Sequence, residues 1–189
     1  MIKDKIILGI DPGTTIMGYG LIHVKNNKPS LLHFGTLLLH KYDDHGTKLK
    51  LIFERTLHLI DTYKPDELAA EAPFFGKNVQ SMLKLGRAQG VALAAALYRN
   101  LPIFEYSPRK IKQSITGKGA ASKEQVALML QRVLAIPETD MPEKLDATDG
   151  LAAAMCHYYQ YKPGLPEPNA KTKLTGWKAF VSQNPDRVK

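Results

Sequence analysis

The sequence has few residues that could form covalent or thiolate cross-links. It contains a single cysteine, Cys156, so an internal disulfide is excluded and a cysteine-ligated zinc site has no support. No apolar run approaches the roughly 18 residues that a membrane span needs. The first residues, MIKDKII, lack the plan of a signal peptide. These absences predict a protein of the reducing cytoplasm with no membrane partner.

Acidic residues are also scarce relative to basic ones. The 189 residues carry a formal charge of +8 and a pI near 9.5, which favours a polyanionic partner. Much of this charge lies in the middle of the chain. Residues 77–132 hold ten Lys or Arg against two acids, Glu105 and Glu124. A solvated helix face explains some of these cations, but a phosphate backbone as partner explains the cluster better.

The stretch from Ile6 to Gly20, IILGIDPGTTIMGYG, organises the rest of the chain. Its apolar start is typical of a strand buried on both faces of a sheet, and the strand stops at Asp11 before a Pro-Gly turn. A carboxylate at a strand end can bind a hard cation such as Mg²⁺. Alternatively, Asp11 only caps the turn.

The pattern of apolar residues predicts an α/β protein with a mixed sheet of five strands. The first three strands are expected as an antiparallel meander, and the fourth is expected to run parallel to the first. The expected strands cover residues 6–10, 19–22, 31–39, 67–71 and 103–106, and the expected helices cover residues 47–63, 78–100, 123–134 and 151–159. Residues 109–119 form a basic stretch that closes in a Gly-Lys-Gly loop.

Three further acids occupy ends of predicted elements, as Asp11 does. Glu71 ends the fourth strand, and Asp146 and Asp149 lie three apart at a helix start, where they also suit helix capping. Four crowded carboxylates would repel one another. Two Mg²⁺ ions would remove that cost and supply two-metal phosphodiester hydrolysis.

The helix predicted at residues 78–100 carries small residues at a four-residue spacing. Gly86 and Gly90 lie on one stripe, and each glycine inside a helix costs on the order of 1 kcal/mol relative to alanine. The stripe therefore indicates close packing, either on the sheet of this chain or on a second subunit.

Five ordered blocks of sequence resemble one known family. They are GIDPG with a following GYG, AAEAPFFGKN, KLGRAQGV, FEYSPRKIKQSITGKG and DATDGLAAA. Together they resemble the RuvC family of Holliday junction resolvases over roughly residues 6–160. The resemblance implies an RNase H-like fold with helices on both faces of the sheet. It also implies an endonuclease of DNA recombination and repair that makes symmetric paired nicks in strands of like polarity, leaving 5′-phosphate and 3′-hydroxyl ends.

The same resemblance implies the residues and partners of the site. The metal-binding catalytic acids would be Asp11, Glu71, Asp146 and Asp149, holding two Mg²⁺ ions, with Mn²⁺ as a substitute. The implied protein partners are a second copy of the chain and the branch-migration proteins RuvA and RuvB. The DNA contacts expected at a four-way junction are Phe74, Phe75, Lys77, Arg109, Lys110, Lys112, Lys118 and Lys123. Of these, Lys112 and Lys123 match family lysines near the scissile phosphate, and Phe74 matches the stacking aromatic.

The expected domain organisation is a nuclease domain at residues 1–161 and a basic tail at residues 162–189. The tail is expected to be extended, with one short helical turn. Three other functions compete with the nuclease. The Asp-Pro-Gly-Thr-Thr segment also resembles the phosphate loop of actin-like ATPases and sugar kinases, but the chain has no room for their second half. A non-catalytic junction-binding protein would not need four acids, and a related nuclease could act on RNA.

Overall fold

A mixed sheet of five strands organises the part of the chain that the structure describes. The structure is a computed structural model, which describes residues 4–73, 78–142 and 144–160. The strands lie in the order β3-β2-β1-β4-β5, and their bounds are β1 Lys5–Asp11, β2 Ile16–Lys25, β3 Lys28–Leu38, β4 Glu67–Glu71 and β5 Ile103–Tyr106. The first three strands pair antiparallel, whereas β4 is parallel to both β1 and β5. The predicted mixed sheet, with its fourth strand parallel to the first, is confirmed.

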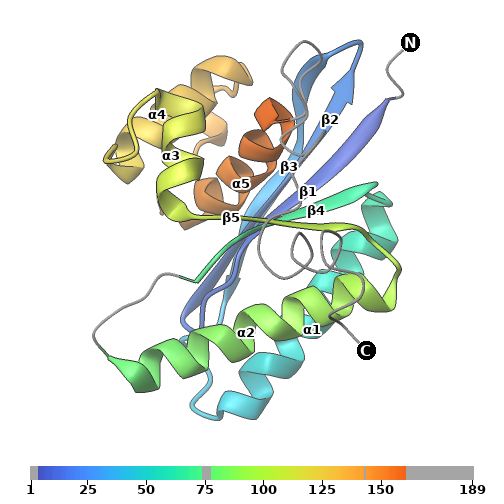
Figure 1. The fold of residues 1–189 in the computed structure, drawn as a ribbon, viewed down its shortest axis with the longest axis vertical. Helices are drawn as coiled ribbons and strands as arrows, with labels where there is room; N and C mark the ends of the chain where they lie inside the picture. Colours follow the sequence, from blue (N-terminus) through green and yellow to red (C-terminus); the bar gives the residue numbers. More distant parts are fainter. Residues whose placement is uncertain (1–3, 74–77, 143, 161–189) are drawn as a thin grey trace, which may run out of the picture. The chain divides into compact units, whose positions relative to one another are not determined.

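Helices cover both faces of this sheet, as the sequence resemblance implied (Figure 1). α1 and α2 lie on one face, and α3, α4 and α5 lie on the other. Their bounds are α1 His45–Tyr63, α2 Val79–Tyr98, α3 Pro108–Thr116, α4 Lys123–Val133 and α5 Asp146–Gln160, with a 3-10 turn at Glu138–Asp140. Within the described ranges, no helix is both long and apolar enough to cross a membrane.

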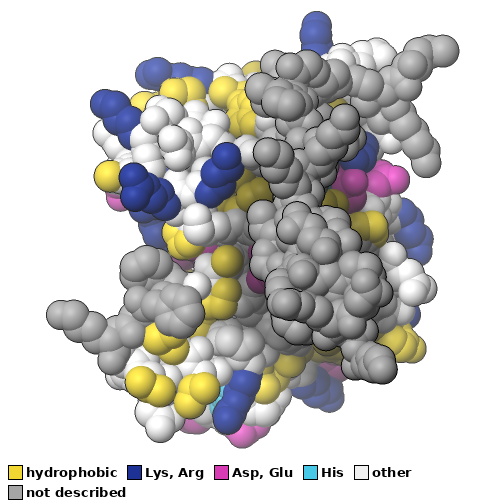
Figure 2. Space-filling model, in the orientation of Figure 1, with side chains coloured by type: hydrophobic (Ala, Val, Ile, Leu, Met, Phe, Trp, Pro, Cys, Tyr) yellow, Lys and Arg dark blue, Asp and Glu magenta, His cyan; other side chains and the backbone are white. Residues whose placement is uncertain are grey.

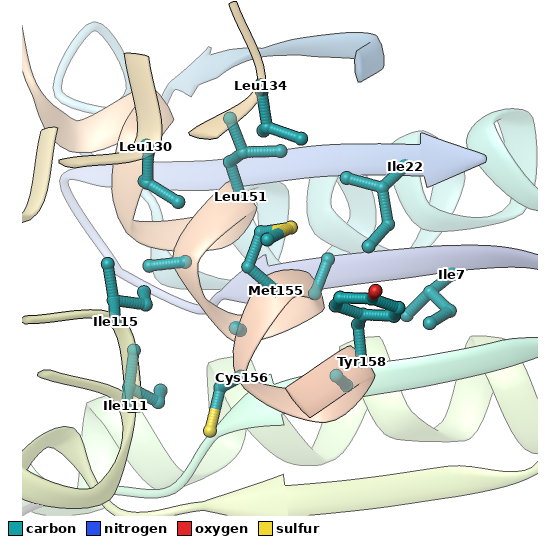
Figure 3. Packing of buried hydrophobic residues seen from close by; sticks show 14 of the residues in the cluster. Ile7, Ile22, Ile111, Ile115, Leu130, Leu134, Leu151, Met155, Cys156 and Tyr158 are labelled. Carbon is teal, nitrogen blue, oxygen red and sulfur yellow. The ribbon is translucent and has the colours of Figure 1, made fainter. Parts of the chain in front are cut away.

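Alternate residues of β1 belong to separate hydrophobic cores. Ile7 packs in the core that α5 covers, whereas Leu8 and Ile10 pack in the core under α1 and α2. Figure 3 shows Ile7 beside Tyr158 of α5, in the same core as Ile22 and Met155. Since successive side chains of a strand point to opposite faces, Asp11 shares the α5 face with Ile7.

Residues 108–116, within a stretch to which the sequence assigned no helix, form α3. The Ser107 hydroxyl accepts the Lys110 amide N–H at 3.3 Å, and Pro108 stands in the first turn. Both are strong helix-start features. Ile111 and Ile115 are buried one turn apart, so α3 is an amphipathic helix that turns its basic residues outward.

The start of α5 contacts the strand backbones directly. α5 begins at Asp146 rather than at the expected Leu151. A Cβ atom added to Gly18 of β2 would lie 2.0 Å from the Asp146 carbonyl oxygen, and one added to Gly9 of β1 would lie 2.1 Å from the Gly150 carbonyl oxygen. Such contacts leave no room for any side chain at these two positions. The glycines therefore hold the first turn of α5 against the strands.

Candidate active site

Two acids end neighbouring parallel strands at one edge of the sheet. Asp11 is the last residue of β1, and Glu71 is the last residue of β4. The two strands pair with Ile10 opposite Ala70, so the next residue of each strand is an acid. Ile7 and Ala69 both belong to the α5 core, and by alternation Asp11 and Glu71 lie on that same face.

The other two predicted acids lie in the first turn of α5, above the same face. The Asp149 side chain is 14% exposed and the Asp146 side chain is 36% exposed. The Asp149 carboxylate accepts a hydrogen bond from the Lys123 amine at 2.5 Å. The structure thus brings together all four acids that the sequence singled out, from two strands and one helix.

Burial and repulsion from neighbouring carboxylates raise the pKa values of Asp11, Glu71 and Asp149. Burial, followed by the negative charges of Glu71, Asp149 and Asp146, raises the pKa of Asp11 to about 8, although the charge of Lys123 opposes this. Burial and the charge of Asp149 raise the pKa of Glu71 to about 7, against the opposing charges of Lys123 and Lys112. Burial also raises the pKa of Asp149, although the amine of Lys123 opposes this. If all four acids were ionised, the site would therefore hold more negative charge than its own lysines neutralise.

Lys123 stands among the acids as a counter-charge. It is the first residue of α4, where Ser122 and Gln125 form a capping box that fixes the helix start. Its amine lies 2.5 Å from Asp149 and 3.5 Å from Asp146. Burial lowers the pKa of Lys123, but the hydrogen bond from its amine to Asp149 and the negative charges of the neighbouring acids together outweigh this and leave that pKa above its ordinary value. The lysine that the sequence assigned to DNA thus contacts two of the acids.

The acids suit divalent cations by the chemistry of their donor atoms. A small cavity of about 90 Å³ lies between Asp11 and Glu71, and Gln89 of α2 is among the residues that line it. Carboxylate oxygens are the ligands that Mg²⁺ prefers, and a divalent ion would relieve the repulsion that raises the pKa values. Within the described ranges, no three Asp, Glu, His or Cys side chains are already close enough to hold a metal ion. Binding of a metal ion by these acids would therefore require movement of their side chains.

A basic groove of about 880 Å³ lies at the start of α3. Arg109, Lys112 and Lys118 line it, together with Ser107, Pro108, Gly119 and Ala120. Figure 2 shows Lys and Arg side chains gathered over the region of α3 and α4. The positive charge of Lys112 also lowers the pKa of Glu71, so the groove adjoins the acids. Lys110 lies on α3 as well and is exposed.

Three of the residues expected to contact DNA have no described position, and one residue beside the acids was not expected. Phe74, Phe75 and Lys77 lie outside the described residues, so their predicted DNA contacts stay predictions. Gln89 was missed by sequence analysis although it lines the cavity beside Asp11 and Glu71. A glutamine within the alanine-rich stretch of α2 is the sequence signal that could have singled it out.

The strand order and the acids at the sheet edge define the class of protein as an RNase H-like α/β fold. Two solved structures share this fold. One is described as "T. thermophilus RuvC in complex with Holliday junction substrate"; it matches with a TM-score of 0.74 and 33% identity over 82% of this chain and 93% of that chain. The other is the yeast mitochondrial Holliday junction resolvase Ydc2, with a TM-score of 0.60 and 16% identity over 81% of this chain and 77% of that chain. At that identity, the second likeness shows the fold alone.

Sequence comparison identifies the family within this class. The family profile described as "Crossover junction endodeoxyribonuclease RuvC" matches residues 7–157. A protein of that description from Christiangramia forsetii is 62% identical, over 99% of this chain and 94% of its own length. Another from Bacteroides fragilis is 60% identical, over 100% of this chain and 98% of its own length. The chain belongs to the RuvC family, as its sequence blocks implied.

Proposed function

We propose that this protein resolves Holliday junctions by nicking two strands of like polarity in DNA recombination and repair. Four carboxylates at one sheet edge adjoin a groove lined by three cations, and this juxtaposition carries the proposal. The groove suits a phosphate backbone, and the acids suit the cations that phosphodiester hydrolysis needs. Family membership supports the junction as substrate, and we place the activity in the cytoplasm.

The catalytic acids in this proposal are Asp11, Glu71, Asp146 and Asp149, which would together hold two Mg²⁺ ions, with Mn²⁺ as a substitute. When bound, such ions activate water for attack on the phosphodiester and stabilise the leaving 3′ oxygen. Cleavage of that bond leaves 5′-phosphate and 3′-hydroxyl ends. The raised pKa values of Asp11 and Glu71 support the assignment. Acids whose pKa is strongly shifted by burial and neighbouring charges are concentrated at functional sites, where a bound ligand offsets the cost of ionising them.

The cations of the groove bind the DNA backbone in this proposal. Lys112 and Lys123 contact the phosphate nearest the acids, since the positive charges of both lysines lower the pKa of Glu71 and so lie close to the acidic site. Lys118, Arg109 and Lys110 follow the strand away from it. Phe74 stacks on an unpaired base at the crossover, with Phe75 as the alternative ring, and Lys77 contacts a nearby phosphate. These three residues lie in the nuclease domain, residues 1–161, ahead of a basic tail at 162–189.

A homodimer fits the symmetry of the substrate, because a two-fold dimer places one site on each of two opposed strands. The outer side of α2 is the proposed interface. Val79, Leu83 and Leu97 are 66%, 52% and 64% exposed. Among the described residues, and apart from the backbone of α2 itself, a Cβ atom added at Gly86 or Gly90 would meet no atom within 4 Å, so both glycines face away from the sheet. RuvA and RuvB are proposed as partners that deliver the junction.

The proposed reaction is tested with labelled four-way junctions, linear duplex and RNA–DNA hybrid, each with and without Mg²⁺. We expect paired symmetric nicks in the junction alone, and only with the metal. Equal cutting of linear duplex or of the hybrid would contradict the proposed substrate. Junction binding without any nicking in Mg²⁺ or Mn²⁺ would indicate a non-catalytic binding protein.

The interface is tested by Gly90→Leu, because the structure leaves open space for a side chain there. The variant should fold at least as well as the wild type, since leucine favours a helix over glycine by roughly 0.8 kcal/mol. It should sediment as a weaker dimer in analytical ultracentrifugation. Arg132→Leu on the exposed side of α4 is a control for added surface leucine. Unchanged dimerisation of Gly90→Leu would remove this part of α2 from the interface.

A further inference from the structure

Gln89 is a buried amide on the alanine-rich packing face of α2. The residue is 5% exposed, and Ala88, Ala92 and Ala96 of the same helix are 0% exposed. An amide buried without partners costs free energy, whereas an apolar side chain of similar size would pack without that cost. Stability alone therefore gives no reason for a glutamine at this position.

The side-chain amide of Gln89 joins three elements at the point where β4 ends. Its Nε2 atom donates to Oε1 of Glu105 on β5 at 2.5 Å, and lies 3.4 Å from the carbonyl oxygen of Glu71. The strands are in register there, with Ala70 opposite Glu105. One amide from α2 thus contacts the last residue of β4 and, on β5, the residue that lies opposite Ala70.

The same amide lines the cavity that separates two of the acids. Asp11, Glu71 and Gln89 all border this space of about 90 Å³. The Gln89 contact is made to the backbone of Glu71, so it leaves the Glu71 carboxylate available. Groups that fix a ligand residue from behind orient it and strengthen metal binding without touching the metal.

We propose that Gln89 is a positioning residue: it ties the end of β4 to α2 and β5 so that Glu71 is held opposite Asp11 for binding of divalent ions. Glu105 serves as the anchor that aims the amide. This inference rests on the proposed function, since it assigns a role toward the same acids. It predicts that the affinity for metal depends on a residue that is no metal ligand itself.

The test is Gln89→Met, which keeps the length and volume of the side chain but removes the donor. The concentration of Mg²⁺ that gives half-maximal thermal stabilisation, measured without DNA, should rise about 10-fold or more. The melting temperature without metal and the affinity for the junction should stay close to wild type. Gln131→Met, at a half-buried glutamine near the end of α4, is the matched control and should leave the Mg²⁺ midpoint unchanged.

A purely structural role predicts the opposite pattern and would overturn the proposal. In that case Gln89→Met lowers the metal-free melting temperature and leaves the Mg²⁺ midpoint where it was. If Gln89→Met fails to fold, Glu105→Ala provides the second test, because Glu105 is exposed and its loss frees the amide. The Glu105 variant should also raise the Mg²⁺ midpoint, and an unchanged midpoint would overturn the proposal.

Combining the two changes tests whether the residues act together. Because Gln89 and Glu105 are in contact, their effects should not add: Glu105→Ala should change the midpoint little in a Gln89→Met background. Full additivity would contradict the anchor role. A wild type that binds Mg²⁺ but nicks no junction would refute the proposed function alone, whereas an unshifted midpoint beside normal nicking would refute this inference alone.

Discussion

The two glutamates at the ends of β4 lie in opposite electrostatic surroundings. Glu67 opens the strand and Glu71 ends it, and both lie on the face that α5 covers. Burial raises the pKa of Glu67, but hydrogen bonds from His157 and Lys5 outweigh it and hold that pKa below its ordinary value. At the other end, burial and the charge of Asp149 raise the pKa of Glu71 to about 7.

The contacts explain this difference. The Glu67 carboxylate lies 2.6 Å from the Lys5 amine and 2.7 Å from Nε2 of His157, whose Nδ1 lies 2.7 Å from the Tyr106 hydroxyl. The two ring nitrogens of His157 thus link the Glu67 carboxylate to the Tyr106 hydroxyl. The protein completes this end of the strand with its own residues. At the Glu71 end, ionisation of the clustered acids is costly because the lysines nearby do not fully compensate burial and repulsion, and we interpret that cost as the sign of a site built for cations.

The largest contrast should appear in catalysis. Glu71→Gln should lower the rate of junction nicking by at least about 10³-fold, which is about 4 kcal/mol of transition-state stabilisation. Asp11→Asn, Asp146→Asn and Asp149→Asn should act alike. Junction affinity should persist or increase, because each change removes negative charge near phosphate. Single-turnover cleavage and binding assays measure both. An acid whose variant nicks at a rate near wild type serves as a cap rather than as a ligand.

The next contrast concerns stability, for which Glu67 should matter more than Glu71. Glu67→Ala should lower the free energy of unfolding by about 3 kcal/mol, the cost of breaking a buried pair from one side. Its nicking rate should stay near wild type at temperatures where it is folded. Glu71→Gln should unfold no more easily than wild type without metal, since it removes a repelled charge. Urea unfolding of both variants measures these free energies. Equal destabilisation of the two variants would contradict the predicted difference between Glu67 and Glu71.

The smallest effect is a dependence of stability on pH. The pKa of Glu67 is lower in the folded than in the unfolded state, so its contribution is present above the unfolded pKa and is lost as pH falls through the folded pKa. The stability difference between wild type and Glu67→Gln should therefore be constant above about pH 6, and should narrow as the pH falls below the unfolded pKa of about 4.3. A difference that stays constant as the pH falls would show that Glu67 acts through packing.

The sequence predicts the four acids better than it predicts the residues that surround and hold them. Asp11 and Glu71 follow apolar runs that are typical of buried strands, and Asp146 and Asp149 are spaced for one helix turn. Periodicity and turn residues carry that information. The roles of Glu67 and His157 depend on a contact 90 residues apart in the chain, and the partners of Gln89 depend on strand register. Neither follows from local pattern.

The start of α3 shows a second limit. Residues 108–116 carry so many cations that their charge masks the two buried isoleucines, Ile111 and Ile115, which define the helix. The helical signal was present in Ser107 and Pro108, which are typical of a helix start. The position of Lys123 among the acids could not be predicted in this way, because it depends on how α4 packs relative to α5.

The central claim is that one end of β4 is built for divalent ions and the other is complete without them. Thermal unfolding with increasing Mg²⁺, measured for wild type, Glu67→Gln and Glu71→Gln without DNA, tests it directly. At about 100 times the dissociation constant, wild type and Glu67→Gln should each gain about 2.7 kcal/mol, and Glu71→Gln should gain much less. Equal gains in all three proteins, or a gain lost only in Glu67→Gln, would contradict the account.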